Sequence, residues 1–147
     1  MPLWEAGLDY NHGTGHGVGA HLNVHEGPQG IGFRKRDNEA GFQPGMTCSN
    51  EPGYYEDGAF GIRIENICIT KKASTPNRFM NKDYCTFETV TFAPIATNLV
   101  NKEMLSPKEV QWLNHYNADV LRLVRPIMEE YFPGEAVAYL QEQCQAI

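Results

Sequence analysis

Alternating glycines from residue 13 to residue 19 are the feature that most limits how this chain can fold. A regular helix is disfavoured there, because each glycine costs roughly 1 kcal/mol relative to alanine. The glycines instead let the backbone approach closely whatever the neighbouring imidazoles face. His12, His16 and His25, with His21 between them, place four of the chain's five histidines within fourteen residues. We interpret this segment as a site-forming loop; the alternative is a glycine-rich loop with incidental histidines.

Phosphate-bearing ligands match the sequence poorly. The glycines at 13, 15, 17 and 19 do not follow the G-x-G-x-x-G spacing, no strand precedes them, and no GK[ST] ending follows. The chain carries 12 Lys+Arg against 18 Asp+Glu, a formal charge of −6. Its basic cluster, residues 34–36, is followed at once by Asp37 and Glu39. We therefore expect no nucleic-acid binding, which needs clustered cations.

Size and composition indicate an ordinary globular domain. The 147 residues, 41% of them hydrophobic, are enough for one domain with a sizeable core. No apolar run approaches the roughly 20 residues of a membrane helix, and the first residues do not resemble a signal peptide. The four cysteines, none in a C-x-x-C pair, are Cys48, Cys68, Cys85 and Cys144. We expect free thiols, a cytoplasmic location and no membrane association.

Turn signals divide the middle of the chain into candidate strands. Pro44-Gly45 and Asp57-Gly58 are typical turn dipeptides. They separate β-branched runs that predict strands over 46–50, 61–70 and 84–92. Both faces of the 61–70 run are partly apolar, which predicts a strand covered on both sides.

The last part of the chain, from about residue 103, is predicted to be helical. Ser106, Pro107 and Glu109 form a capping-box pattern. Apolar residues then recur with a period near 3.6, interrupted by the polar Asn117. We expect Pro126 to kink or end this helix and a second helix to span 135–144. The pair is amphipathic, as in helices that cover a sheet or form an interface.

Two glutamates stand in positions where a carboxylate needs a partner. Glu51 follows a predicted strand, and Glu65 lies within one, between Ile64 and Asn66. A buried carboxylate is costly unless a cation or several donors meet it. Arg63, on the same strand face as Glu65, would supply a structural ion pair. The alternative is a metal ion, because two glutamates and a histidine are a ligand set suited to Mn, Co or Zn.

Four motifs in this order resemble a known family. They are HGTGHGVG from His12, NVHEGP from Asn23, NEPGYY from Asn50 and GIRIEN from Gly61. Together they resemble the metal-dependent Xaa-Pro aminopeptidases (aminopeptidase P) of the pita-bread peptidases. The resemblance implies an α+β fold, the C-terminal half of a pita-bread domain, with a curved, mostly antiparallel sheet covered by helices. Residues 1–147 would be the C-terminal portion of a catalytic domain, β-rich to about 102 and a helical pair from about 103.

The resemblance also assigns candidate roles to single residues. His16, Glu51 and Glu65 match metal ligands, and Glu51 also matches the general base. His12 and His25 match histidines that orient substrate and stabilise the developing oxyanion. Arg63 matches an arginine that supports the bridging glutamate, Glu65. Tyr54 and Tyr55 are weaker candidates, for lining a proline-shaped substrate pocket.

The implied reaction is hydrolysis of the N-terminal Xaa-Pro bond of peptides with proline second. Two divalent ions, manganese by analogy with the family and otherwise cobalt or zinc, would activate the water. Family members also use two upstream aspartates as ligands, and neither Asp9 nor Asp57 matches them. We therefore expect this chain alone to be inactive. By analogy with the family, we also expect that it can form a homodimer. The alternatives are a prolidase-type dipeptidase and a pita-bread binding module without metal.

Overall fold

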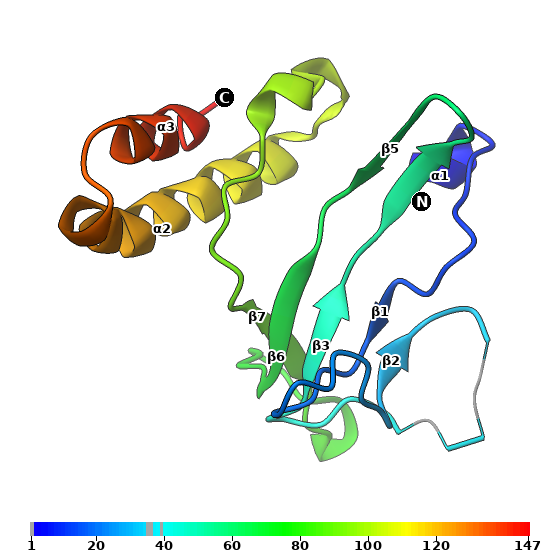
Figure 1. Ribbon diagram of the computed structural model, residues 1–147. Helices are drawn as coiled ribbons and strands as arrows, with labels where there is room; N and C mark the ends of the chain where they lie inside the picture. The colour runs from blue at the N-terminus through cyan, green and yellow to red at the C-terminus, as the bar shows by residue number, and fades with distance from the viewer. Residues whose placement is uncertain (1, 35–36, 39) are drawn as a thin grey trace. The chain divides into compact units, whose positions relative to one another are not determined.

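The computed structural model describes residues 2–34, 37–38 and 40–147. Two residues of the basic cluster, Lys35 and Arg36, lie outside the described residues, as does Glu39. The chain forms two compact units, Met1–Thr91 and Phe92–Ile147. The first unit contains all the strands, and the second contains the long helix α2 and the shorter α3, as Figure 1 shows.

A three-stranded antiparallel sheet is the centre of the first unit, with the order β3-β6-β7. The strands are β3 (Thr47–Asn50), β6 (Asn66–Lys72) and β7 (Cys85–Thr89). Strands β3 and β7 fall within the predicted runs 46–50 and 84–92. Cys48 of β3 lies directly opposite Cys68 of β6, and both are buried. All four cysteines are free thiols, and burial raises the pKa of the Cys48 and Cys68 thiols.

The predicted strand over 61–70 is interrupted. Its first part belongs to β5 (Phe60–Arg63), which forms an antiparallel hairpin with β4 (Gly53–Glu56), and its second part belongs to β6. The chain changes partner here because β3 and β4 are themselves separated by Glu51 and Pro52. Pro52 has no N–H to give to a ladder. Strand β5 is exposed along its whole length, so the expected cover on both sides is wrong for this part.

The glycine–histidine segment is not helical, as its composition predicts. It contains β1 (Gly15–His16), which pairs with β2 (Gly30–Ile31) in an antiparallel ladder. A bridge between Gly17 and Cys48 continues this ladder to β3. The remaining elements of the unit are short: α1 (Pro2–Glu5) and the 3₁₀ turn η1 (Phe79–Asn81). All the pairings are antiparallel, in agreement with the expected α+β fold.

The second unit is a helix pair preceded by two 3₁₀ turns, η2 (Thr97–Leu99) and η3 (Lys102–Met104). Helix α2 (Pro107–Tyr131) begins at the predicted capping box, in which Ser106 and Glu109 bond reciprocally. The helix continues through Pro126 instead of ending there. Pro126 is exposed, so water can satisfy the carbonyl that its missing N–H leaves free. Helix α3 (Glu135–Gln143) follows the turn at Pro133-Gly134.

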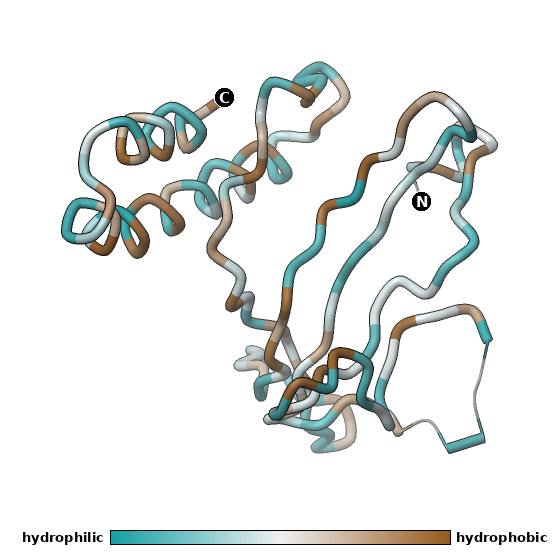
Figure 2. Tube along the Cα trace, viewed as in Figure 1, coloured by the Kyte–Doolittle hydropathy of each residue, from teal (hydrophilic) through white to brown (hydrophobic). Residues whose placement is uncertain are grey.

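A small core joins the two helices of this unit. Its buried members are Tyr116, Val120, Leu140 and Cys144. Figure 2 shows the hydrophobic residues recurring along α2 between polar ones. Asn117, the polar residue that interrupts the apolar pattern of α2, is buried, with 1% of its surface exposed. Both polar atoms of its side chain are hydrogen-bonded. Its amide accepts a hydrogen bond from the Ile95 N–H at 3.0 Å and donates to the carbonyls of Ile95 and Gln143.

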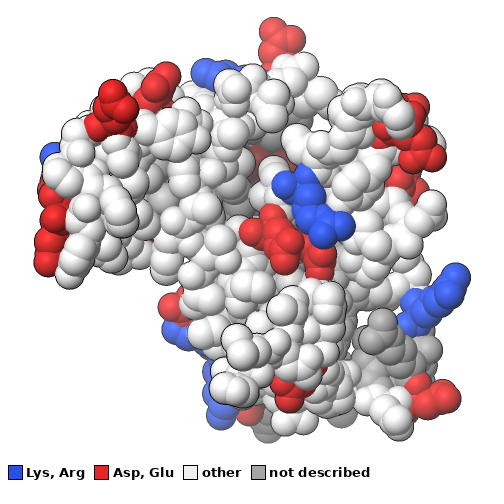
Figure 3. All heavy atoms as spheres, in the orientation of Figure 1, with Lys and Arg blue, Asp and Glu red and all other residues white. Residues whose placement is uncertain are grey.

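Charged and apolar side chains are both widespread on the surface. Figure 3 shows acidic groups at several separate places on one face, with basic groups between them. Large apolar side chains are also exposed in the first unit, among them Phe60, Ile62 and Ile64. Within the described residues, no helix has the length and apolar character to cross a membrane.

Candidate metal centre

Strand β1 reaches the centre of the first unit because it is built from glycine. A Cβ on Gly15 would lie 2.1 Å from the carbonyl oxygen of Ser49, closer than any side chain can come. This close approach lets the His16 N–H donate to Ser49 Oγ at 2.9 Å. The glycine that disfavours a helix therefore also fixes His16 beside β3.

Three of the predicted metal ligands come together. The candidate ligand atoms of His16, Glu51 and Glu65 all lie within 4.8 Å of one another. His16 Nε2 and Glu51 Oε1 are 3.1 Å apart. These three residues form the one group of histidine, cysteine and acidic side chains among the described residues that could hold a metal ion. Among the described residues, Asp9 and Asp57 are not part of this group.

The interruption between the two ladders places the two glutamates opposite each other. Asn50 pairs with Asn66 on one side of the interruption, and Gly53 pairs with Arg63 on the other. The register is therefore the same on both sides of the interruption. The unpaired step consists of residues 51–52 on one side and 64–65 on the other, and Glu51 faces Glu65 across it. Successive side chains alternate in direction along an extended chain, so residues opposite each other share a face. Both carboxylates consequently point to the same side.

Burial differs between the two glutamates. Glu51 is 8% exposed, whereas Glu65 is exposed, so the expectation that Glu65 is buried is wrong. Glu65 lies at the step between β5 and β6 and continues the run of exposed residues along β5. Of the two carboxylates, Glu51 is therefore the one whose burial requires a cation or several hydrogen-bond donors.

Glu51 is held by three groups. Ser49 Oγ donates to Oε1 at 2.9 Å, His16 Nε2 approaches the same oxygen, and Arg63 Nη1 lies 3.1 Å from Oε2. The ion pair of Arg63 is thus with Glu51, whereas the strand pattern offered Glu65 as its partner. The pattern misses this because Glu51 lies in a neighbouring segment of the chain, between β3 and β4. Ser49 was not among the predicted site residues, since a hydroxyl in a strand carries no distinctive sequence signal.

Tyr55 orients Arg63. The Arg63 Nε–H donates to the Tyr55 hydroxyl at 2.7 Å. This hydrogen bond, followed by the charges of Glu51 and Glu65, raises the pKa of Arg63, which stays cationic. The Tyr55 ring lies over Gly53 and Gly61, where a Cβ would approach it to less than 3 Å. Two glycines thus provide the space in which the ring lies flat on the hairpin.

Tyr54 lies on the other face of β4. Its hydroxyl donates to Glu56 at 2.5 Å, and its ring contacts Phe60. The Glu56 carboxylate, through this hydrogen bond first, raises the pKa of Tyr54. The structure does not bring Tyr54 to the ligand cluster, whereas Tyr55 does contact residues there.

The other two histidines flank the cluster. The His25 ring lies against the His16 ring, with centroids 4.2 Å apart. The His12 ring meets the Tyr55 ring edge-on at 5.5 Å. His12 Nδ1 contacts the Gly13 carbonyl at 2.7 Å, and its Nε2 is buried without a hydrogen-bond partner in the described structure. In the same way, His16 Nδ1 contacts the Gly17 carbonyl at 2.9 Å, so Nε2, which faces Glu51 Oε1, is the ring nitrogen available as a ligand.

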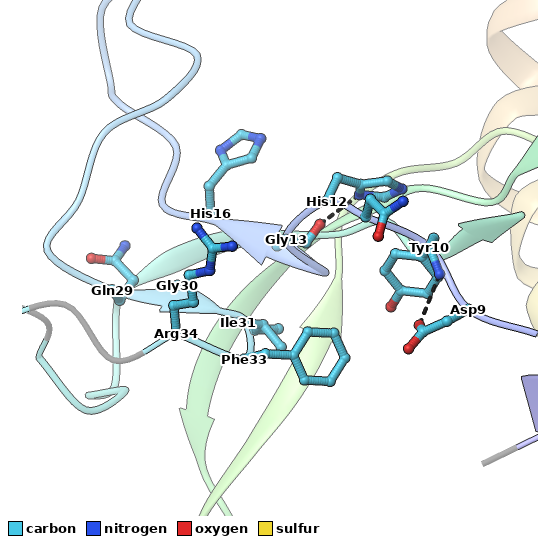
Figure 4. Close-up of a pocket in the computed structure, with 13 residues that line it drawn as sticks. Asp9, Tyr10, His12, Gly13, His16, Gln29, Gly30, Ile31, Phe33 and Arg34 are labelled. Atoms are coloured by element: carbon cyan, nitrogen blue, oxygen red, sulfur yellow. Dashed lines mark hydrogen bonds between the residues drawn. The ribbon is translucent and has the colours of Figure 1, made fainter. Parts of the chain in front are cut away.

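A cleft of about 710 Å³ adjoins these histidines. His12 and His16 line one part of it, and the β2 segment from Gly30 to Arg34 lines another (Figure 4). Aromatic side chains complete the wall, with the Tyr10 ring tilted against the His12 ring at a centroid distance of 4.6 Å. The arrangement is a cluster of metal-ligating groups at the edge of an aromatic cleft.

Comparison with known proteins identifies a family. The description "Metallopeptidase family M24" matches residues 1–72, and "C-terminal region of peptidase_M24" matches residues 83–147. Fold, site and sequence together show that the chain belongs to the M24 pita-bread metallopeptidases and corresponds to the C-terminal portion of a catalytic domain of the aminopeptidase P type.

Individual relatives are similar over most of this chain. It is 55% identical to "Probable Xaa-Pro aminopeptidase P" of Coprinopsis cinerea over 127 residues, covering 86% of this chain and 20% of the relative. It is 59% identical to "Aminopeptidase P2" of Arabidopsis thaliana, with 86% and 18% covered. The chain thus spans about a fifth of the length of these curated relatives.

A solved structure is also similar. It is the X-prolyl aminopeptidase of Caenorhabditis elegans, described as a cytosolic enzyme with a di-nuclear active site. The TM-score is 0.87 at 40% identity, and the match covers 99% of this chain and 23% of that one.

Proposed function

We propose that this chain supplies one half of the active site of a metalloaminopeptidase that hydrolyses the N-terminal Xaa-Pro bond of peptides. The observation that carries the proposal is the convergence of His16, Glu51 and Glu65 within 4.8 Å. The similarity to Xaa-Pro aminopeptidases supports the same substrate class, peptides with proline in the second position.

The donor set fits a divalent cation. One imidazole nitrogen and two carboxylates suit Mn, Co or Zn, and manganese is our first choice by family analogy. His16, Glu51 and Glu65 would hold the metal, and two aspartates from another part of the complete enzyme would help to bind a pair of ions. When bound, such a pair supplies an acidified water and stabilises charge on the attacked carbonyl.

Each remaining residue has a role that its contacts support. Glu51 accepts the proton of the attacking water, and Ser49 and Arg63 keep its two oxygens in place. His12 offers its buried, unpaired Nε2 to the substrate. His12 and His25 orient the substrate and, when protonated, donate to the oxygen on which negative charge develops. Arg63 supports Glu51 and, at longer range, Glu65. Tyr55 acts through Arg63 and lines the substrate site, whereas Tyr54, on the other face of β4, does not line it.

The isolated chain is expected to lack peptidase activity. It provides three ligands where the family uses five, so it binds one divalent ion at most. We propose that the complete enzyme is cytoplasmic, like its Caenorhabditis elegans relative, and homodimeric. Apolar groups exposed on this chain, such as Ile62 and Ile64, would favour self-association.

Metal-titration calorimetry tests the proposal. We expect wild type to bind one Mn²⁺, Co²⁺ or Zn²⁺ ion, and His16→Ala and Glu51→Gln each to abolish this binding. His115→Ala is the matched control, because His115 is exposed on α2 outside the cluster. Two tightly bound ions would show that the ligand assignment is wrong. Equal binding by His16→Ala and wild type would contradict the proposed centre.

A peptide assay tests the reaction. With the upstream half of the catalytic domain restored, we expect manganese-dependent cleavage of a longer Xaa-Pro peptide. Strong preference for an Xaa-Pro dipeptide would favour a prolidase instead, and absence of both metal binding and cleavage would favour a binding module. Cleavage above blank by the isolated chain would contradict its expected inactivity.

A further inference from the structure

Two of the four cysteines face each other within the three-stranded sheet. Cys48 of β3 and Cys68 of β6 are a register pair, and the two strands run side by side in Figure 1. Both side chains are free thiols, and their residues are only 1% and 8% exposed. Residues directly opposite each other in a sheet point to the same face. The two sulfur atoms therefore share one buried space.

The place of this pair in the ladder sets the distance between its two residues. The Thr70 N–H donates to the Met46 carbonyl at 2.8 Å, which makes Met46 and Thr70 a hydrogen-bonded pair. Such pairs occupy every second position of an antiparallel ladder, so the next one is Cys48 with Cys68. Their Cα atoms should be roughly 5.5 Å apart, inside the roughly 4.4–6.8 Å that disulfides span. In keeping with this proximity, Cys68 adds to the effect of burial in raising the pKa of the Cys48 thiol.

The other two cysteines have different surroundings. Cys85 of β7 is exposed and lies opposite Lys72 of β6. Cys144 belongs to the small core of the helical unit. Cys48 and Cys68 are therefore the two cysteines that the sheet register holds together.

The pair lies near the candidate metal centre along both strands, but on the other face. Cys48 precedes Glu51 by three residues, and Cys68 follows Glu65 by three. Ser49 and Glu51 are hydrogen-bonded to each other and so share a face, which places the Cys48 side chain on the opposite one. A bond between the two sulfurs would leave the ligand cluster unobstructed. It would join covalently the two strands that carry the carboxylates.

We propose that Cys48 and Cys68 form an oxidative modification site, at which a low-molecular-weight disulfide such as oxidised glutathione closes a reversible bond between β3 and β6. Cys68, the more exposed thiol, attacks one sulfur of the oxidant as a thiolate, and one glutathione thiolate leaves. Cys48 then attacks the Cys68 sulfur of this mixed disulfide, and the second glutathione thiolate leaves. The two cysteines give up two protons and two electrons, and the oxidant takes both and departs as two thiols.

The bond should form slowly and be reduced easily. Burial slows its formation, because the thiolate is the attacking species. A disulfide also needs Cβ atoms roughly 3.5–4.5 Å apart, whereas those of a hydrogen-bonded pair are up to roughly 5.5 Å apart. The strands must adjust to close this gap, and a strained disulfide is the more reducible kind. Disulfides of reducing compartments are usually transient in this way.

Oxidation followed by thiol mapping tests the proposal. The probe is oxidised glutathione, applied for hours at neutral pH to the folded Cys85→Ala chain, because the exposed Cys85 thiol would otherwise form mixed disulfides. Remaining thiols are alkylated in urea, and linked peptides are identified by mass spectrometry. We expect one bond, between Cys48 and Cys68, that dithiothreitol reverses. At a chain concentration of about 10 µM it should exceed links between chains by about a hundredfold, because neighbouring groups have millimolar effective concentrations.

Single variants and an unfolded sample decide the outcome. Cys48→Ala and Cys68→Ala, each in the Cys85→Ala chain, should form no internal bond. Cys144→Ala, the matched change at a buried thiol of the other unit, should retain it. Circular dichroism verifies that each variant is folded. The proposal is overturned if Cys48 and Cys68 of the folded chain remain thiols while the oxidant links cysteines of the urea-unfolded chain, or if either of them bonds Cys144 instead.

Discussion

The Tyr55 hydroxyl and the Arg63 guanidinium are joined by a hydrogen bond of 2.7 Å, and Arg63 in turn holds Glu51 at 3.1 Å. Two contacts thus connect an exposed tyrosine to the buried carboxylate of the candidate metal centre. Partners of this kind usually matter for metal affinity as much as for stability, because they fix the ligand in its binding orientation.

Tyr55→Phe should lower the affinity for a divalent ion by about tenfold, the smaller end of the effects seen for such partners. The ring stays on Gly53 and Gly61, so the loss would come from the hydroxyl. Calorimetric titration with Mn²⁺ or Zn²⁺ measures the change. Tyr54→Phe is the control, because its hydroxyl bonds Glu56 on the other face. Equal losses in the two variants would show that the Tyr55–Arg63 contact has no special role.

Gly15→Ala should both destabilise the chain and weaken metal binding. The new Cβ would meet backbone of β3, which cannot move aside as a flexible side chain can. Overpacking of this kind lowers the free energy of unfolding by about 1–3 kcal/mol. Urea denaturation would measure this loss. Gly32→Ala provides the comparison, because a Cβ there meets no atom within 4 Å. The interpretation fails if both variants unfold at the wild-type urea concentration.

Ser106→Ala should shorten or destabilise α2, because Ser106 caps its first turn. Loss of such a cap typically costs about 1 kcal/mol. The side-chain and backbone hydrogen bonds of Ser106 lower the pKa of Glu109. Stability from this contact is therefore present above the unfolded-state pKa of glutamate, about 4.3. It is lost as the pH falls through the lower folded-state value.

Thermal melts from pH 7 to pH 3 measure this dependence. The gap between wild type and Ser106→Ala should narrow as the pH falls. Lys108→Ala, with an exposed side chain in the same turn, serves as the control. A gap that is constant over the whole pH range would mean that the carboxylate of Glu109 does not contribute.

Asn117→Leu should destabilise the helical unit by about 1–3 kcal/mol, the usual cost of leaving buried polar groups unpaired. The substitution keeps the volume but removes the partners of the Ile95 N–H and carbonyl. Hydrogen exchange at the Ile95 amide should rise with it. Gln111→Leu, on the exposed side of α2, is the matched change. A variant as stable as wild type would show that water replaces these bonds without cost.

Local sequence signals predicted the elements that depend on neighbouring residues. The start of α2 follows from Ser106, Pro107 and Glu109, which interact with one another within one turn. The continuation of α2 through Pro126 does not follow from local sequence, because it depends on which side of the helix faces solvent. The interruption at residues 64–65 is similarly a consequence of pairing with β3 and β4, and no local pattern marks it.

The candidate site was predicted unevenly for the same reason. Ordered motifs pointed to His16, Glu51 and Glu65, and the structure brings their ligand atoms together, although their chemical roles remain proposals. The partner of Arg63 was missed, because choosing between Glu51 and Glu65 requires the hairpin geometry. Ser49 was missed too, since its role comes from the distance between strands and not from its neighbours in sequence.

The unpaired step that brings Glu51 opposite Glu65 has a consequence for natural and engineered sequence change. Two residues separate β3 from β4, and two separate β5 from β6. Lengthening or shortening one connection alone would turn one carboxylate to the opposite side of the hairpin. Insertions and deletions should therefore be excluded from both connections, or occur in both together. Substitutions that keep the spacing should be tolerated at Ile64, whereas Pro52 also interrupts the ladder through its missing N–H.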